Sequence, residues 1–153
     1  MPENLLPVSH WMQRQQADCL AACTAMVLDY LGQTTEYDQL LRLLSIGPIG
    51  APSSNIQRLG VLNLTVTYER GSMADLETHL EHDTPCIVFV QTSELPYWST
   101  DTGHAVVVVG MDEDTVYLND PALGKAPQTV SRGDFELAWL ARDYRYAVIT
   151  RRL

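Results

Sequence analysis

The stretch from Cys19 to Leu31 is the segment that most constrains how this chain can fold. It reads Cys-Leu-Ala-Ala-Cys-Thr-Ala-Met-Val-Leu-Asp-Tyr-Leu, with Asp18 before it as an N-cap and Gly32 after it as a helix stop. We therefore expect a helix over this range. Because the helix is apolar on nearly all sides, other elements must cover it from several directions. It should be the buried central helix of the fold.

Helices are expected mainly before residue 83 and strands mainly after it. The predicted helices span 36–44, with Thr35 and Asp38 resembling a capping box, then a short turn over 54–59, then 72–82, opened by Ser72. Strands rich in Val, Ile and Tyr are predicted at 64–68, 86–90, 104–111, 115–118 and 146–150, with a late helix over 133–141 capped by Ser131. This order predicts an α+β fold, with a helical lobe against an antiparallel sheet.

Length, composition and charge limit the functions that the chain can have. Its 153 residues suit one domain over residues 1–153, and a 46% hydrophobic content is that of a globular protein. The net charge of -9 argues against nucleic acid as a partner. Neither a signal peptide nor an apolar run of roughly 20 residues is visible, so we expect a cytoplasmic protein with no membrane segment.

Cys19 is the candidate nucleophile among the three cysteines, an odd number that argues against a complete disulfide framework. Cys86 lies in a strand pattern, and Cys23 lies one turn inside the apolar helix, so both fit inert buried thiols. Cys19 stands at the helix start, where unpaired backbone amides and the helix dipole stabilise a thiolate. An isolated cysteine in such a helix would otherwise be taken as a core residue, so the assignment depends on its surroundings.

His104 and Asp120 are expected to meet across a hairpin. His104 opens the strand over 104–111, and Asp120 follows the next strand, with the tight polar turn Asp112-Glu-Asp114 between the two strands. Strands of similar length across a tight turn bring such ends together. Asp120 can then fix the tautomer of the His104 ring, although turn chemistry before Pro121 would also explain an aspartate there.

Gln13 is the candidate oxyanion donor, six residues before Cys19. Its amide, with the backbone N–H of Cys19, would form a hole with two donors. The neighbouring Gln15 and Gln16 make a polar loop cluster an alternative reading of the same residues.

These segments together resemble one family. Gln13-Arg-Gln-Gln-Ala-Asp-Cys19, Gly103-His104-Ala-Val-Val-Val-Val-Gly110 and Val116-Tyr-Leu-Asn-Asp120-Pro121 resemble, in this order, the signature segments of the C39 family of papain-like cysteine peptidases. The resemblance implies a papain-like fold, with Cys19, His104 and Asp120 as a catalytic triad and Gln13 as the oxyanion donor. It implies no cofactor and no metal.

The resemblance also suggests a substrate. Well-known members remove leader peptides after a Gly-Gly pair within peptide exporters, so a peptide or protein substrate and a peptide exporter are the partners that it implies. No exporter segment is visible in this sequence, and we expect a freestanding domain or one excised from a longer protein. One departure concerns specificity, because Leu20 stands where the family commonly has glycine after the nucleophile.

Alternative functions remain open at this stage. The same acyl-enzyme could pass its acyl group to an amine, which would make the protein an amide or acyl transferase. A catalytically inactive peptide-binding module is the third reading, although such a module has no need to keep all four residues.

His79 and His82 suggest a metal pair only weakly, because a solvated helix end explains them. Zinc on Cys19, Cys23 and His104 lacks a fourth ligand.

Overall fold

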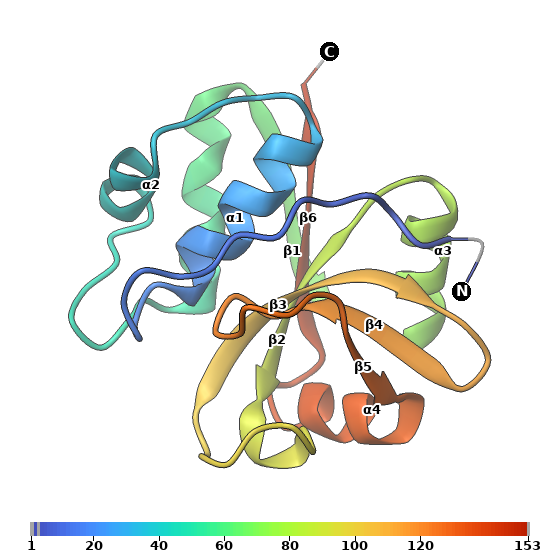
Figure 1. The fold of residues 1–153 in the computed structure, drawn as a ribbon. Helices are drawn as coiled ribbons and strands as arrows, with labels where there is room; N and C mark the ends of the chain where they lie inside the picture. Colours follow the sequence, from blue (N-terminus) through green and yellow to red (C-terminus); the bar gives the residue numbers. More distant parts are fainter. Residues whose placement is uncertain (1, 3, 153) are drawn as a thin grey trace.

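A six-stranded antiparallel sheet with helices on both faces forms the fold in the computed structural model, which describes residues 2 and 4–152 (Figure 1). The strand order is β1-β6-β2-β3-β4-β5. Along the chain the elements are α1 (Cys19–Tyr30), α2 (Tyr37–Leu43), the 3₁₀ segment η1 (Ser53–Leu62), β1 (Leu64–Arg70), α3 (Met73–Glu81), β2 (Cys86–Gln91), the 3₁₀ turn η2 (Thr92–Glu94), β3 (Gly103–Met111), β4 (Thr115–Asn119), β5 (Gln128–Ser131), α4 (Arg132–Leu140) and β6 (Arg145–Arg151).

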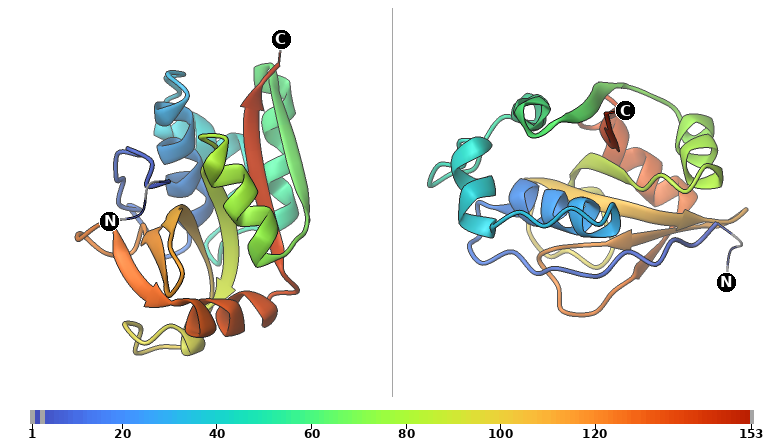
Figure 2. Two further views of the ribbon diagram at one scale, coloured as in Figure 1. Left: turned by 90° about the vertical axis from the view of Figure 1, so that its right-hand side faces the viewer. Right: turned by 90° about the horizontal axis from the view of Figure 1, so that it is seen from above.

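Two apolar cores lie on opposite faces of the sheet, because successive strand side chains point to opposite sides. Ile87 and Phe89 of β2 face a core built with α1, α2 and η1. Val88 and Val90 of the same strand face a second core built with α3 and α4. The two views in Figure 2, one from the side and one from above, show helices on both sides of the twisted sheet. The α+β prediction, with a helical lobe against an antiparallel sheet, is confirmed.

Helix α1 is the centre of the first core, as its sequence predicts. Every residue from Leu20 to Leu28 is buried. The helix packs against β3, whose apolar run is buried almost throughout because an apolar core covers each face of the sheet there. None of the helices in the described part of the chain combines the length and apolar character that a membrane span requires.

Several local predictions are correct and others are wrong. Ser72 and Ser131 cap α3 and α4 through their side chains. The capping box expected from Thr35 and Asp38 is wrong, because α2 has Glu36 as its N-cap without a side-chain cap bond. Strand β5 was not expected, since its four residues carry little pattern and pair only with β4. The 3₁₀ segment η1 is longer than the short turn predicted over 54–59.

A β-bulge in β3 fastens the N-terminal segment to the sheet. The register between β3 and β4 shifts between Val108 and Gly110, and the carbonyl of Val109 accepts a hydrogen bond from the N–H of Leu6 at 2.8 Å. A Cβ at position 110 would lie 2.9 Å from the Leu5 Cδ1 atom and 3.2 Å from its Cα. Glycine is therefore needed where the N-terminal segment crosses the strand.

Asp18 precedes α1, but it does not cap the helix through its side chain as the sequence suggested. Its buried carboxylate instead accepts hydrogen bonds from the N–H groups of Gln15 (2.7 Å) and Arg14 (3.2 Å) and from the hydroxyl of Tyr37. These bonds turn the chain back toward the start of α1. Asp18 thus shapes the loop that joins Gln13 to Cys19.

Replacing Tyr37 with phenylalanine tests this role. We expect Tyr37→Phe to lower the free energy of unfolding by about 2 kcal/mol, because a buried carboxylate loses one of its donors. The control is Tyr30→Phe, which removes a hydroxyl that donates to an exposed carbonyl, and we expect it to cost less than about 0.5 kcal/mol. Urea denaturation measures both, and equal effects would contradict the role given to Asp18.

Candidate active site

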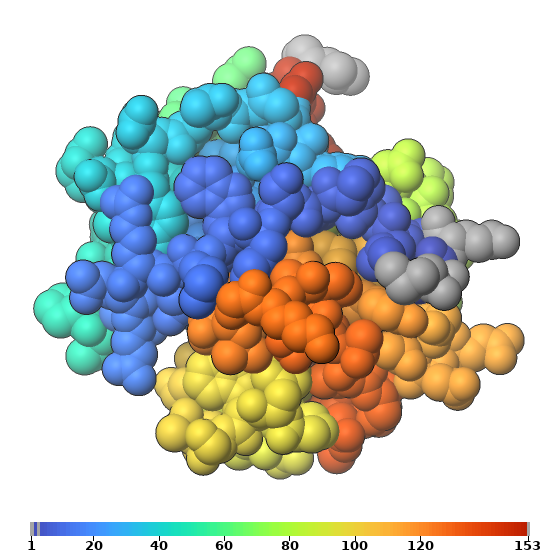
Figure 3. Space-filling model, in the orientation of Figure 1, coloured from blue at the N-terminus to red at the C-terminus, as the bar shows by residue number. Residues whose placement is uncertain are grey.

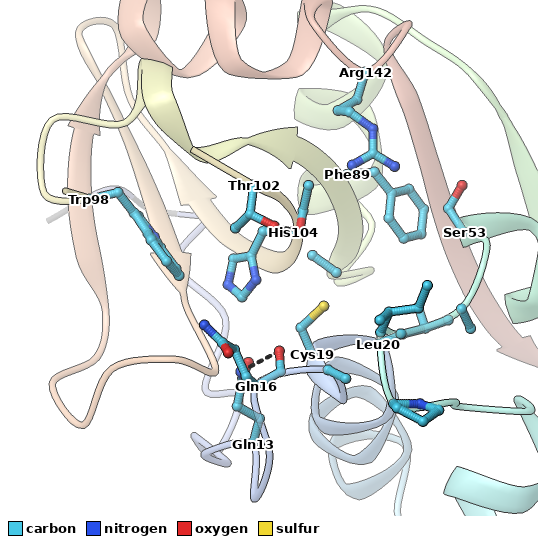
Figure 4. Close-up of a pocket in the computed structure, with 17 residues that line it drawn as sticks. Gln13, Gln16, Cys19, Leu20, Ser53, Phe89, Trp98, Thr102, His104 and Arg142 are labelled. Carbon is cyan, nitrogen blue, oxygen red and sulfur yellow. Dashed lines mark hydrogen bonds between the residues drawn. The ribbon is translucent and has the colours of Figure 1, made fainter. Parts of the chain in front are cut away.

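A pocket of about 540 Å³ lies between the start of α1 and the start of β3. Cys19 and Leu20 line it from the helix, His104 and Ala105 from the strand. In the close-up view the sulfur of Cys19 and the ring of His104 both project into it (Figure 4). The pocket therefore joins the helical lobe to the sheet at the two residues that the sequence selected.

His104 and Asp120 form a buried pair across the β3–β4 hairpin. The register pairs Val107 with Asn119, so His104 and Asp120 share one face of the sheet. The Nε2 atom of His104 lies 2.7 Å from Oδ1 of Asp120, and both side chains are almost fully buried. The hairpin geometry predicted from the sequence is confirmed, and Nδ1 is the ring nitrogen left for the thiol.

The Asp120 carboxylate receives three further hydrogen bonds. The N–H of Ala122 donates to Oδ1 at 3.0 Å, which is the turn chemistry expected around Pro121. The hydroxyl of Tyr97 (2.8 Å) and the indole N–H of Trp98 (2.9 Å) both donate to Oδ2. Four donors thus surround a carboxylate that has no exposed surface, and they hold it as an anion in one orientation.

The pKa values of the pair follow from these contacts. Burial by itself lowers the pKa of His104, but hydrogen bonds and charge attraction from Asp120 and Cys19 outweigh burial and raise it from 6.5 to about 9. Burial by itself raises the pKa of the Asp120 carboxyl, but its hydrogen bond with His104 and the histidine's charge hold that pKa below its usual value. The charges therefore favour an imidazolium beside a carboxylate near neutral pH.

The three thiols lie in different surroundings. Cys19 is partly exposed at the pocket, whereas Cys23 and Cys86 are fully buried. Burial raises the pKa of the Cys23 thiol well above its usual value, and the nearby Cys19 and Asp120 add to this effect. Burial alone raises the pKa of Cys86. The separation of one accessible thiol from two core thiols agrees with the sequence prediction.

Gln13 lies in the pocket wall, on the loop that leads to Cys19. Its backbone N–H donates to the carbonyl of Pro121 at 2.8 Å, which ties this loop to the residue after Asp120. Its side-chain Nε2 donates to the Gln16 carbonyl at 3.2 Å, and one amide hydrogen is left for another acceptor. The space-filling view shows the N-terminal segment lying against the connection between β4 and β5 (Figure 3).

Comparison with known proteins agrees with this arrangement. The model of the peptidase C39 family matches residues 8–142, which is most of the chain. The chain belongs to the peptidase C39 family. The family assignment made from the three sequence segments is therefore confirmed.

Relatives of this C39 chain include larger transport proteins. It is 28% identical over 126 residues to the colicin V secretion/processing ATP-binding protein CvaB of Escherichia coli, a match that covers 80% of this chain and 16% of that protein. The peptidase domain of Streptococcus ComA has the same fold, with a TM-score of 0.78 at 18% identity over 95% of this chain and 99% of that one.

A second solved structure contains a ligand. It is described as a double glycine motif protease from an AMS/PCAT transporter in complex with the leader peptide. Its TM-score is 0.76 at 20% identity, with 96% of the C39 chain and 94% of that chain covered. At this identity the likeness shows a shared fold.

Sequence reasoning missed two parts of this C39 site. As single aromatics in a loop, Tyr97 and Trp98 suit packing as well as a cleft, yet both donate hydrogen bonds to Asp120, and the Trp98 ring meets the His104 ring edge to face at 4.9 Å between centroids. The signal was their adjacency in the loop just before His104. No motif in the sequence singles out Arg142, although it lines the pocket.

The histidines outside the pocket have local partners. His79 Nε2 lies 3.1 Å from the hydroxyl of Tyr146, and His82 Nδ1 lies 2.8 Å from the carbonyl of Thr78. Within residues 2 and 4–152, histidine, cysteine and carboxylate side chains do not gather in groups of three or more suited to a metal ion.

The titration of His104 tests the buried pair. We expect its ring, followed by NMR, to titrate near pH 9 and to shift toward its ordinary value of 6.5 in Asp120→Asn, because the neutral amide no longer attracts the imidazolium. Glu113→Gln, a change at an exposed turn, is the matched control and should leave the midpoint unchanged.

Stability should follow the same titration. Because the folded pKa of His104 is raised, its contribution is complete below about pH 6.5 and is lost as the pH rises toward 9. The difference in unfolding free energy between the wild type and His104→Gln should shrink across this window. A difference that stays constant or grows with pH would contradict the assigned pair.

Proposed function

We propose that this chain is a cysteine peptidase in which Cys19 is the nucleophile, His104 the acid and base, Asp120 the orienting carboxylate and Gln13 the oxyanion donor. The observation that carries the proposal is the buried His104–Asp120 hydrogen bond at 2.7 Å, beside a pocket into which the Cys19 sulfur points (Figure 4). Membership of the peptidase C39 family supports it independently.

Acylation begins from the thiolate of Cys19 beside the imidazolium of His104. The sulfur attacks the scissile carbonyl carbon, and the oxyanion that forms accepts hydrogen bonds from the Cys19 backbone N–H and the Gln13 amide. Nδ1 of His104 then gives its proton to the leaving amine as the C–N bond breaks. A thioester on Cys19 and a free amine are the products of this step.

Deacylation reverses these roles. His104, now neutral, takes a proton from a water molecule that attacks the thioester carbon. The second tetrahedral intermediate releases the carboxylic acid and the Cys19 thiolate, while the proton remains on His104. Asp120 holds Nε2–H throughout, so the same nitrogen, Nδ1, always faces the reacting atoms.

The proposed substrates are leader peptides with a Gly-Gly pair before the cleavage site. Leu20 lines the pocket beside Cys19, and we propose that its side chain limits the size of the residues that fit at the scissile bond. One structural neighbour is described as a double glycine motif protease with a leader peptide bound, which supports this choice. A peptide exporter is the corresponding proposed partner. Because the reaction needs a free thiol, we also propose a reducing, cytoplasmic setting.

Selective alkylation tests the nucleophile. We expect brief treatment with iodoacetamide near neutral pH to label Cys19 and to spare Cys23 and Cys86, because burial raises the pKa of both of these thiols and blocks the reagent. Mass spectrometry of the digested protein locates the label. Comparable labelling of all three thiols in the folded protein would show that Cys19 is not activated.

Cleavage of Gly-Gly peptides ranks the site residues. Cys19→Ala should abolish turnover without unfolding the chain, and His104→Ala should be nearly as severe. Asp120→Asn should cost less, because it keeps the shape of the side chain. Gln13→Ala should slow acylation by roughly 10- to 1000-fold, the range expected for one lost oxyanion donor.

Gln16→Ala is the matched control for Gln13→Ala. Gln16 contacts Gln13 through its backbone carbonyl, which alanine retains, so its substitution should change the rate little. Pre-steady-state measurement of the released amine isolates acylation. A crippling Gln16→Ala beside a silent Gln13→Ala would reject the oxyanion assignment while leaving Cys19 as the nucleophile.

A further inference from the structure

Arg142 brings a positive charge into the catalytic pocket. It follows α4 in the chain, and its side chain lines the pocket together with Phe89 and Gly103. In Figure 4 its guanidinium lies on the opposite side of His104 from Trp98. A peptide lying across Cys19 would therefore meet Arg142 on one side of its scissile bond and Trp98 on the other.

The guanidinium of Arg142 pairs with no carboxylate among the described residues, in contrast to Arg14, Arg70, Arg132 and Arg145. Arg42, Arg58, Arg151 and Arg152 are also without such a partner there, but Arg142 is the arginine that lines the pocket. The chain as a whole carries a net charge of -9. The charge of Arg142 in the pocket is therefore opposite in sign to that of the whole molecule. Arginine presents a planar group of donors that matches a carboxylate in two places at once.

Gly103 makes room for this side chain. A Cβ at position 103 would lie 1.9 Å from Nη1 of Arg142 and 3.1 Å from its Cζ. The guanidinium thus lies against the backbone of Gly103, next to His104, the proposed acid and base. A side chain at this position would force Arg142 to move.

We propose that Arg142 forms a carboxylate-binding subsite that selects peptides with an acidic group a few residues from the scissile bond. The inference rests on the proposed peptidase function, because it names a substrate feature for the same pocket. Two sources supply the chemistry: the side chain of an aspartate or glutamate, and the terminal carboxylate of a short peptide. Held by Arg142, either would fix the register of the peptide over Cys19.

Binding to the Cys19→Ala protein tests the subsite without any need for turnover. The probes are Gly-Gly peptides in matched pairs, with Glu or Gln at each of the four positions before and after the glycine pair, each made with a free or an amidated C-terminus. Calorimetry should show one position, or the free terminus, at which the carboxylate improves affinity by about tenfold, as expected for one charge-assisted hydrogen-bonded pair.

Arg142→Gln in the Cys19→Ala background should abolish this preference, so that the charged and uncharged peptides of each pair bind with equal affinity. Arg142→Lys should keep part of it, because lysine retains the charge without the planar donor group. Gly103→Ala should weaken it by displacing the guanidinium. Arg58→Gln, at an exposed arginine outside the pocket, is the control and should preserve the full preference.

The position that responds identifies the source of the carboxylate. A preference confined to free-terminus peptides would assign the subsite to the terminal carboxylate, and one confined to Glu peptides would assign it to a side chain. No preference at any position, or one that survives Arg142→Gln, overturns the inference. Wild-type enzyme that cleaves none of the peptides while the Arg142-dependent preference persists would reject the peptidase function and retain the subsite.

Discussion

The hydrogen bond between His104 and Asp120 is the interaction on which the organisation of the pocket depends. A carboxylate without exposed surface is costly unless donors surround it, and Asp120 has four: the His104 ring, the Ala122 N–H, the Tyr97 hydroxyl and the Trp98 indole. The loop before β3 and the turn after β4 both donate hydrogen bonds to this carboxylate, and these bonds hold both segments in place. The raised pKa of His104 follows from the same contact.

Two further sets of hydrogen bonds, around Asp18 and Gln13, place the helical lobe beside His104 and Asp120. The buried Asp18 carboxylate gathers backbone N–H groups and the Tyr37 hydroxyl, and so shapes the loop before Cys19. The Gln13 N–H then joins that loop to the Pro121 carbonyl, next to Asp120. These bonds hold the loop that leads to Cys19 beside the turn that carries Asp120, so a thiol at a helix start and a histidine at a strand start line one pocket. This is the arrangement that a thiol peptidase requires.

The pocket walls suggest how one family fold can take particular substrates. Leu20 stands beside Cys19, and Arg142 supplies a cation that the bare backbone of Gly103 accommodates. Neither residue belongs to the proposed reaction chemistry. Both lie where a peptide must pass to reach Cys19, so they are placed to affect which peptides fit without altering the acid–base pair.

The sequence alone determined the α+β fold, the central buried helix, and the facing of His104 and Asp120, because these follow from local apolar patterns, strand propensity and a short hairpin turn. It also located Cys19 at a helix start, since the apolar run that forms the helix begins directly after it. Only the tertiary structure decided that Asp18 binds loop amides instead of capping its helix, that Tyr97 and Trp98 clamp Asp120, and that Arg142 enters the pocket. Tyr97 and Trp98 lie more than 20 residues from Asp120, and Asp18 bonds loop amides only where Tyr37, 19 residues away, also reaches its carboxylate. How the sheet, helices and loops pack selects these partners, and no local pattern records it.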